Sequence, residues 1–204
     1  MEIKTLAVGQ LETNCYVIID EENRVCAIVD PGDESNVILN FVEELKLSPR
    51  AIFITHGHYD HTMVADELAM EWDVPVYIHE KEVATGHGFH RYQYAAKENI
   101  RHYKEGDKIQ VGNLTVHVME TPGHSPGSVV LQVESSLFTG DTLFRDGCGR
   151  TDLPGGDMDT LMRSLGRIYR LKGVEDVYPG HAEATTLERE RRFNHYLKHA
   201  AALK

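Results

Sequence analysis

The stretch that most constrains this chain is the heptapeptide at 55–61, Thr-His-Gly-His-Tyr-Asp-His, which directly follows the apolar run at 51–54. The short, β-branched run predicts a buried strand, so the heptapeptide marks the point where a strand gives way to a loop. His56 and His58 are two residues apart and can point at the same place from an extended loop end. Four metal-capable side chains lie within six positions here: His56, His58, Asp60 and His61.

The residues after this loop have helical spacing, with Asp60 as the expected N-cap and His61 in the first turn. Imidazole and carboxylate groups suit zinc, iron or manganese, and one ion rarely takes four ligands from so tight a loop. The spacing therefore indicates two ions side by side. The alternative is an ordinary polar loop in a chain that contains 12 histidines. The position directly after an apolar strand favours metal binding.

Three later apolar runs end in the same way. His124 lies between Pro-Gly and Ser-Pro-Gly after a predicted hairpin around Gly112-Asn113, Asp141 follows an apolar run and Gly140, and His181 follows a run at 174–178. We therefore expect seven side chains to converge on one edge of a sheet system as a two-metal site: His56, His58, Asp60, His61, His124, Asp141 and His181.

Several other features allow two interpretations. Asp30 is either a turn former or a carboxylate that orients a ligand histidine. Cys148 is either reactive or structurally buried, and burial is favoured. The irregular segment 85–103 is interpreted as a surface flap beside the active site rather than a second metal site. In this flap we expect four residues to influence substrate choice: Arg91, Tyr94, Arg101 and Tyr103.

The remaining pattern predicts strands at 3–8, 15–19, 25–29 and 74–78. It also predicts a helix capped by Ser35 or Asn36, a helix at 158–169 and one charged helix at 186–202.

The length of 204 residues favours a single domain over 1–204. The net charge of -11 argues against a nucleic-acid partner, and without a long apolar stretch or an evident secretory signal we expect no membrane partner either. Three cysteines without metal or redox spacing favour a cytoplasmic location. The sequence leaves the oligomeric state unknown.

The motifs Thr55-His56-x-His58-x-Asp60-His61, Pro122-Gly123-His124, Gly140-Asp141 and Pro179-Gly180-His181 together resemble the metallo-β-lactamase superfamily over essentially the whole chain. This resemblance implies an α/β (α+β) fold, a four-layer αβ/βα sandwich of two mixed β-sheets with the metals at one edge. It also implies how the ligands divide between the ions. One ion would take His56, His58 and His124, the other would take Asp60, His61 and His181, and Asp141 would bridge them.

Within that superfamily, Phe138-Thr139-Gly140-Asp141 and the segment 147–152, Gly-Cys-Gly-Arg-Thr-Asp, resemble the glyoxalase II and persulfide dioxygenase branch. The segment 153–157 is similar to that of short glyoxalase II-like hydrolases. Two departures concern glutathione. Full-length glyoxalase II has an additional C-terminal helical domain that contacts glutathione, whereas one helix is predicted after His181. Ser128 also stands where many glyoxalase II sequences carry a second histidine.

These features predict a metal-dependent thioesterase that converts S-lactoylglutathione, or a related small-molecule thioester, into a hydroxy acid and a thiol. Two divalent ions about 3.5–4 Å apart, with zinc favoured over iron or manganese, would hold a bridging hydroxide as the nucleophile. Asp60 is the expected catalytic residue, which would orient that nucleophile as well as bind metal. The leaving group is a thiolate whose thiol has a pKa of about 8.5, so its departure requires no strong general acid.

The main alternative is a persulfide dioxygenase with a single iron held by two histidines and an aspartate. A nuclease of the same superfamily is disfavoured by the acidic charge and by the lack of a basic segment. A binding module without activity would leave the complete set of metal-capable residues without a purpose.

Overall fold

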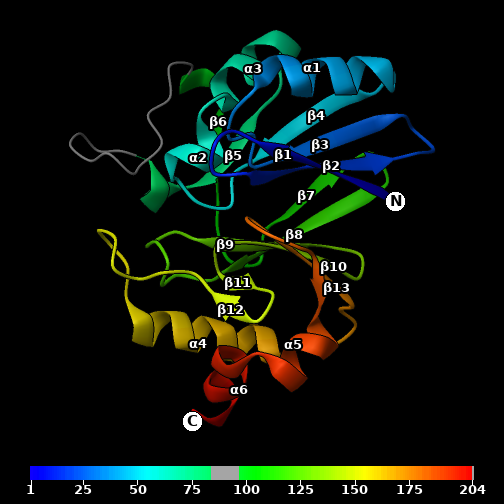
Figure 1. The fold of residues 1–204 in the computed structure, drawn as a ribbon. Helices are drawn as coiled ribbons and strands as arrows, with labels where there is room; N and C mark the ends of the chain where they lie inside the picture. Colours follow the sequence, from blue (N-terminus) through cyan, green and yellow to red (C-terminus); the bar gives the residue numbers. More distant parts are fainter. Residues whose placement is uncertain (84–96, 204) are drawn as a thin grey trace.

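Two six-stranded β-sheets lie face to face, with helices on the outer side of each (Figure 1). This computed structural model describes residues 1–83 and 97–203. The four layers confirm the predicted αβ/βα sandwich. No helix within the described residues is long and apolar enough to cross a bilayer.

The first sheet contains the N-terminal strands in chain order, antiparallel from β1 to β3 and parallel from β3 to β6. Its strands are β1 (Glu2–Val8), β2 (Thr13–Asp20), β3 (Val25–Val29), β4 (Ser48–Phe53), β5 (Val76–His79) and β6 (Ile100–Tyr103). Its outer face is covered by α1 (Ser35–Glu44) and α3 (Ala65–Trp72), while the short α2 (Tyr59–Thr62) lies at one edge (Figure 1). The 3-10 turn η1 (Glu80–Glu82) follows β5, and the 3-10 turn η2 (Lys97–Asn99) precedes β6.

The second sheet has the order β14-β13-β10-β9-β8-β7, in which only the β10–β13 pair is parallel. Its strands are β7 (Lys108–Val111), β8 (Leu114–Glu120), β9 (Val129–Val133), β10 (Ser136–Gly140), β13 (Asp176–Pro179) and β14 (Thr185–Thr186). A separate two-stranded hairpin consists of β11 (Leu143–Phe144) and β12 (Gly147–Cys148). Three helices cover the outer side: α4 (Met158–Tyr169), α5 (Leu187–Phe193) and α6 (His195–Ala202).

Three apolar layers fill the spaces between these four layers. The apolar run in strand β2 is explained by its burial on both faces. Val17 and Ile19 pack toward the helices, while Tyr16 and Ile18 pack between the sheets. A strand that is covered on both faces needs apolar residues at every position. The third layer joins the second sheet to α4 and the C-terminal helices.

Some predicted boundaries are wrong. The first helix is capped by Glu34, which has a left-handed backbone (φ 55°) and makes no side-chain capping bond, rather than by Ser35 or Asn36. His58 is the N-cap of α2, so Asp60 lies in the first turn instead. The C-terminal helix is two helices, because the extended backbone of Asn194 (φ -71°, ψ 114°) separates α5 from α6.

The flap prediction for 85–103 is only partly testable, because Arg91 and Tyr94 lie outside the described residues. Its last four residues are not a flap but the edge strand β6. Tyr103 is a core residue, 2% exposed, whose hydroxyl donates to the carbonyl of Ile54. It therefore stabilises the start of the 55–61 loop rather than contacting substrate.

Candidate metal centre

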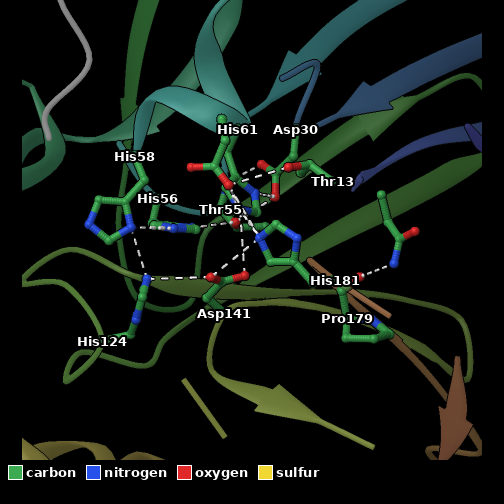
Figure 2. A network of polar contacts seen from close by, with 12 residues as sticks. Thr13, Asp30, Thr55, His56, His58, His61, His124, Asp141, Pro179 and His181 are labelled. Carbon is green, nitrogen blue, oxygen red and sulfur yellow. Dashed lines mark hydrogen bonds and ion pairs between the residues drawn. The ribbon is translucent and has the colours of Figure 1, made fainter. Parts of the chain in front are cut away.

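Four strand ends bring the predicted metal-binding residues to one edge of the sandwich (Figure 2). The loop after β4 supplies four of them, and the loops after β8, β10 and β13 supply His124, Asp141 and His181. Because β3 and β4 are parallel, Asp30 at the end of β3 lies beside the same loop. Six of the seven predicted ligands form two close groups of three, and Asp141 lies between these groups.

The first group is a cluster of three buried imidazoles. His58 Nδ1 lies 3.0 Å from His56 Nε2 and 2.9 Å from His124 Nε2. Ligands about 2.0–2.1 Å from a tetrahedral ion are separated by about 3.4 Å, so the observed spacing is close to that of a metal site. Nitrogens that approach this closely share a proton or a cation.

The second group combines a carboxylate with two imidazoles. His181 Nε2 lies 3.2 Å from Asp60 Oδ2 and 3.3 Å from His61 Nε2. Asp60 Oδ2 and His61 Nε2 are 3.5 Å apart. The three side chains range from fully buried His61 to partly exposed His181, so this group lies nearer to solvent than the first.

Asp141 lies between the two groups. Its Oδ1 is 3.5 Å from His61 Nε2, and its Oδ2 is 3.6 Å from His124 Nε2 and 3.7 Å from His181 Nε2. Within residues 1–83 and 97–203, Oδ1 is the one buried side-chain oxygen or nitrogen that lacks a hydrogen-bond partner. Such an atom is costly unless a cation is nearby. The donor set therefore fits a pair of divalent ions with Asp141 between them.

Asp30 forms a third close group with His56 and His61, but its hydrogen bonds assign it a positioning role. Its carboxylate accepts from the Thr55 amide (2.7 Å), the Thr55 hydroxyl (2.6 Å) and His61 Nδ1 (2.9 Å). This bond to Nδ1 leaves His61 Nε2 directed at the centre. Of the two interpretations of Asp30, the structure supports the carboxylate that orients a histidine.

Two backbone carbonyls orient two of the other histidines. His124 Nδ1 donates to the carbonyl of Arg150 (2.8 Å), and His181 Nδ1 donates to the carbonyl of Leu11 (3.1 Å). A carbonyl only accepts, so in the neutral imidazole the proton lies on Nδ1 and Nε2 is the free nitrogen that faces the centre. Sequence analysis missed both contacts, because any residue can supply a carbonyl.

The Pro-Gly-His motif at 179–181 has a steric reason. A Cβ on Gly180 would lie 2.3 Å from Asp141 Oδ1 and 2.7 Å from His61 Cε1. Only glycine lets this backbone pass so close to both groups.

The protonation of the centre without metal follows from burial and charge. Burial, reinforced by the neighbouring histidines, holds the pKa of His56 well below its ordinary value. Burial also lowers the pKa of His61, but the carboxylates of Asp141 and Asp30 outweigh it and raise that pKa to about 9. Burial raises the pKa of Asp60, yet the hydrogen bond from His181 and the charge of His61 bring it well below its ordinary value. Metal binding must therefore displace a proton from His61.

A cavity of about 660 Å³ opens beside these donor atoms. Its floor is formed by residues of the centre, and its walls by Leu11, Phe144, Cys148 and Leu153. Arg150 at its rim makes two 2.6 Å contacts with the carboxylate of Asp152. Burial raises the pKa of the Cys148 thiol to about 11, which matches a structural rather than a reactive cysteine.

Comparison with known proteins matches residues 8–181 to the metallo-beta-lactamase superfamily. The chain is 35% identical over 208 residues to the probable metallo-hydrolase YqgX of Bacillus subtilis, covering 97% of this chain and 98% of that protein. It is 31% identical over 209 residues to the hydroxyacylglutathione hydrolase GloC of Haemophilus influenzae, covering 97% and 98%.

Solved structures with the same fold include BLEG-1, a B3 metallo-beta-lactamase, with a TM-score of 0.85 and 32% identity over 96% of this chain and 99% of that one. TTHA1623 in a di-iron-bound form has a TM-score of 0.82 and 33% identity over 95% and 99%. ETHE1 from Myxococcus xanthus has a TM-score of 0.82 and 27% identity over 100% and 92%.

Proposed function

The chain belongs to the metallo-beta-lactamase superfamily as a metal-dependent hydrolase, and from that premise we propose that it hydrolyses small thioesters of the glyoxalase II type with two metal ions. The observation that carries the proposal is Asp141, whose carboxylate lies between two groups of three donors and within 3.7 Å of nitrogens from both. The likeness to a hydroxyacylglutathione hydrolase supports the thioester as substrate.

The proposed ligands are His56, His58 and His124 for one ion, Asp60, His61 and His181 for the other, and Asp141 for both. When bound, a pair of divalent ions would lower the pKa of a bound water toward neutrality and would polarise the substrate carbonyl. Imidazole-rich ligands suit zinc, while the di-iron form of TTHA1623 supports iron as the alternative.

Asp60 is the proposed catalytic residue. It borders the cavity, and its Oδ2 already accepts a hydrogen bond from the Thr13 hydroxyl (3.3 Å), which fixes the carboxylate. A carboxylate held in this position can accept a hydrogen bond from the attacking water and keep that water directed at the carbonyl. The thiolate needs little protonation, so the reaction requires no strong general acid.

The cavity walls bear on which thioester binds. Leu11, Phe144 and Leu153 offer apolar contact, and Arg150, the cationic residue among the described wall positions, is already paired with Asp152. A glutathione carboxylate would have to replace Asp152 in that pair. We therefore propose an uncharged acyl group against the apolar wall.

The first experiment loads the protein with zinc or iron and measures hydrolysis of S-lactoylglutathione and of an acyl-coenzyme A thioester. Asp60→Asn should lower turnover at least about 100-fold, whereas Asp73→Asn, an exposed aspartate with a left-handed backbone, should leave it unchanged. Full turnover by Asp60→Asn would disprove the role of Asp60. A metal-loaded wild type that cleaves neither thioester would overturn the proposed reaction.

A persulfide dioxygenase with a single iron is the second candidate, favoured by the likeness to ETHE1 over the whole chain. Oxygen uptake with glutathione persulfide on the iron-loaded protein separates it from a hydrolase. A β-lactam belongs in the same set of assays, because BLEG-1 is also similar.

We further propose a cytoplasmic location and a small-molecule partner rather than nucleic acid. The three cysteines are free thiols, which is typical of proteins in a reducing compartment, and the net charge of -11 opposes binding to a phosphate backbone.

A further inference from the structure

Glu82 is a buried carboxylate behind the metal centre, at the end of the 3-10 turn that follows β5. It is 1% exposed. Its Oε2 accepts from the amide of Gly57 (2.7 Å) and its Oε1 accepts from the amide of Gly127 (2.5 Å). One side chain therefore holds two loops that are far apart in the sequence.

Each of those loops carries part of the first metal-binding group. Gly57 lies between His56 and His58, and Gly127 lies three residues after His124. The second loop is internally tied, because the Ser125 amide donates to the Ser128 hydroxyl (3.2 Å). A shift at Gly127 is therefore transmitted to His124.

The two glycines let the carboxylate approach. A Cβ on Gly57 would lie 2.6 Å from the Glu82 carbonyl oxygen and 3.1 Å from its Oε2. A Cβ on Gly127 would lie 2.7 Å from His79 Nδ1 and 3.0 Å from Glu82 Cγ. Close packing on both sides leaves Glu82 little room for another conformation.

The bonding pattern explains why this position needs an acid. Among the described residues Glu82 makes no ion pair, so its charge is buried with two backbone amides as partners. A buried charge without a cation is costly. A glutamine would avoid that charge, but it has one acceptor oxygen, and its amide group would face the N–H of one glycine. A carboxylate is the group that accepts from both loops.

We propose that Glu82 is a positioning residue that sets the affinity of one metal site, the one formed by His56, His58 and His124. The inference rests on the proposed binuclear centre and is independent of the substrate. Residues that orient ligands without touching the ion typically change metal affinity about 10–100-fold. The group of Asp60, His61 and His181 is oriented instead by Asp30 and by the carbonyl of Leu11, so its affinity should not depend on Glu82.

The test measures zinc affinity by competition with a chromophoric chelator in two backgrounds. His181→Ala removes a ligand of the second ion, so zinc binds only to the first group. In this background Glu82→Gln should weaken zinc binding at least about 10-fold. His124→Ala removes a ligand of the first ion, so zinc binds only to the second group. In this background Glu82→Gln should change the zinc affinity less than about 3-fold. Glu80→Gln, an exposed glutamate of the same turn, is the matched control and should change neither.

An equal loss in both backgrounds would show a merely structural role and overturn the proposal, as would no loss in either. If Glu82→Gln does not fold, Glu82→Asp keeps the charge but is too short to reach both amides, and the same selective loss is expected. If neither variant folds, Glu82 serves the fold as a whole and the selective role is overturned. Wild type that binds no zinc would instead refute the metal centre itself.

Discussion

At the scale of single residues, the unpartnered oxygen of Asp141 is the strongest indication that two ions share this centre. An asparagine of the same size has one acceptor oxygen and no negative charge, so it is a poorer ligand for a pair of cations. Asp141→Asn should lower the metal content from about two ions toward one and reduce hydrolysis at least about 100-fold.

Elemental analysis of the folded variant measures the first effect, and circular dichroism verifies the fold. Asp159→Asn replaces an exposed aspartate at the start of α4 and should keep both ions. Two tightly bound ions in Asp141→Asn would contradict the bridging position.

The thiol of Cys148 provides a pH-dependent prediction. With a pKa of about 11, about one thiol in a thousand is ionised at pH 8. Since the thiolate is the reactive form, the alkylation rate of Cys148 should rise about tenfold per pH unit from pH 7 to 10. Mass spectrometry after iodoacetamide treatment follows this rate. The control is a cysteine in an unstructured peptide with blocked ends, whose pKa of about 8.5 should make its alkylation rate level off within the same pH range. A similar plateau for Cys148 would show that burial does not raise the pKa of its thiol.

The candidate metal-binding side chains could be predicted because four separate apolar runs each end in a histidine or an aspartate, and three of the histidines lie within six residues. The groups that orient them could not. The carbonyls of Leu11 and Arg150 leave no trace in the sequence, since every residue has one. Glu82 is one acid among the 32 Asp and Glu residues of the chain, and only the fold brings it between two distant loops.

At the scale of elements, the strands were predictable and the C-terminal helix was not. Strands β2 and β3 are buried at every position, which produces unmistakable apolar runs. The break between α5 and α6 depends on Asn194, whose amide donates to the carbonyls of Phe144 (3.1 Å) and Gly147 (2.9 Å). These contacts span about 50 residues of sequence, so local helical spacing cannot reveal them.

Asn194 therefore holds the β11–β12 hairpin, which contributes Phe144 and Cys148 to the cavity wall. Asn194→Ala also removes the side-chain cap of α6, an acceptor for the Leu197 amide. We expect a loss of about 2–4 kcal/mol in the free energy of unfolding and a higher KM, with metal content unchanged.

Denaturant unfolding and thioester kinetics test the two effects of Asn194→Ala separately. Asn40→Ala, in the exposed part of α1, should change stability by less than about 0.5 kcal/mol and leave KM unchanged. An unchanged KM in folded Asn194→Ala would show that the hairpin does not shape the substrate site.

At the scale of the whole molecule, the centre joins the two sheets. The first sheet and its loops supply His56, His58, Asp60 and His61, while the second supplies His124, Asp141 and His181. Each of the two proposed metal-binding groups contains members from both halves. A bound ion therefore links the halves directly, and binding should stabilise the sandwich as a unit.

Metal removal should consequently lower the thermal stability. A ligand present at about 1,000 times its Kd contributes about 4 kcal/mol per site, which corresponds to a Tm shift of about 8–16 °C in a domain of this size. Differential scanning calorimetry with and without chelator measures the shift. His117→Ala, at an exposed strand position, should keep the full shift, while His181→Ala should retain only the part due to one ion. An identical Tm with and without chelator would mean that the donors are not held together by metal, because an ion bound across both sheets cannot leave their unfolding unchanged.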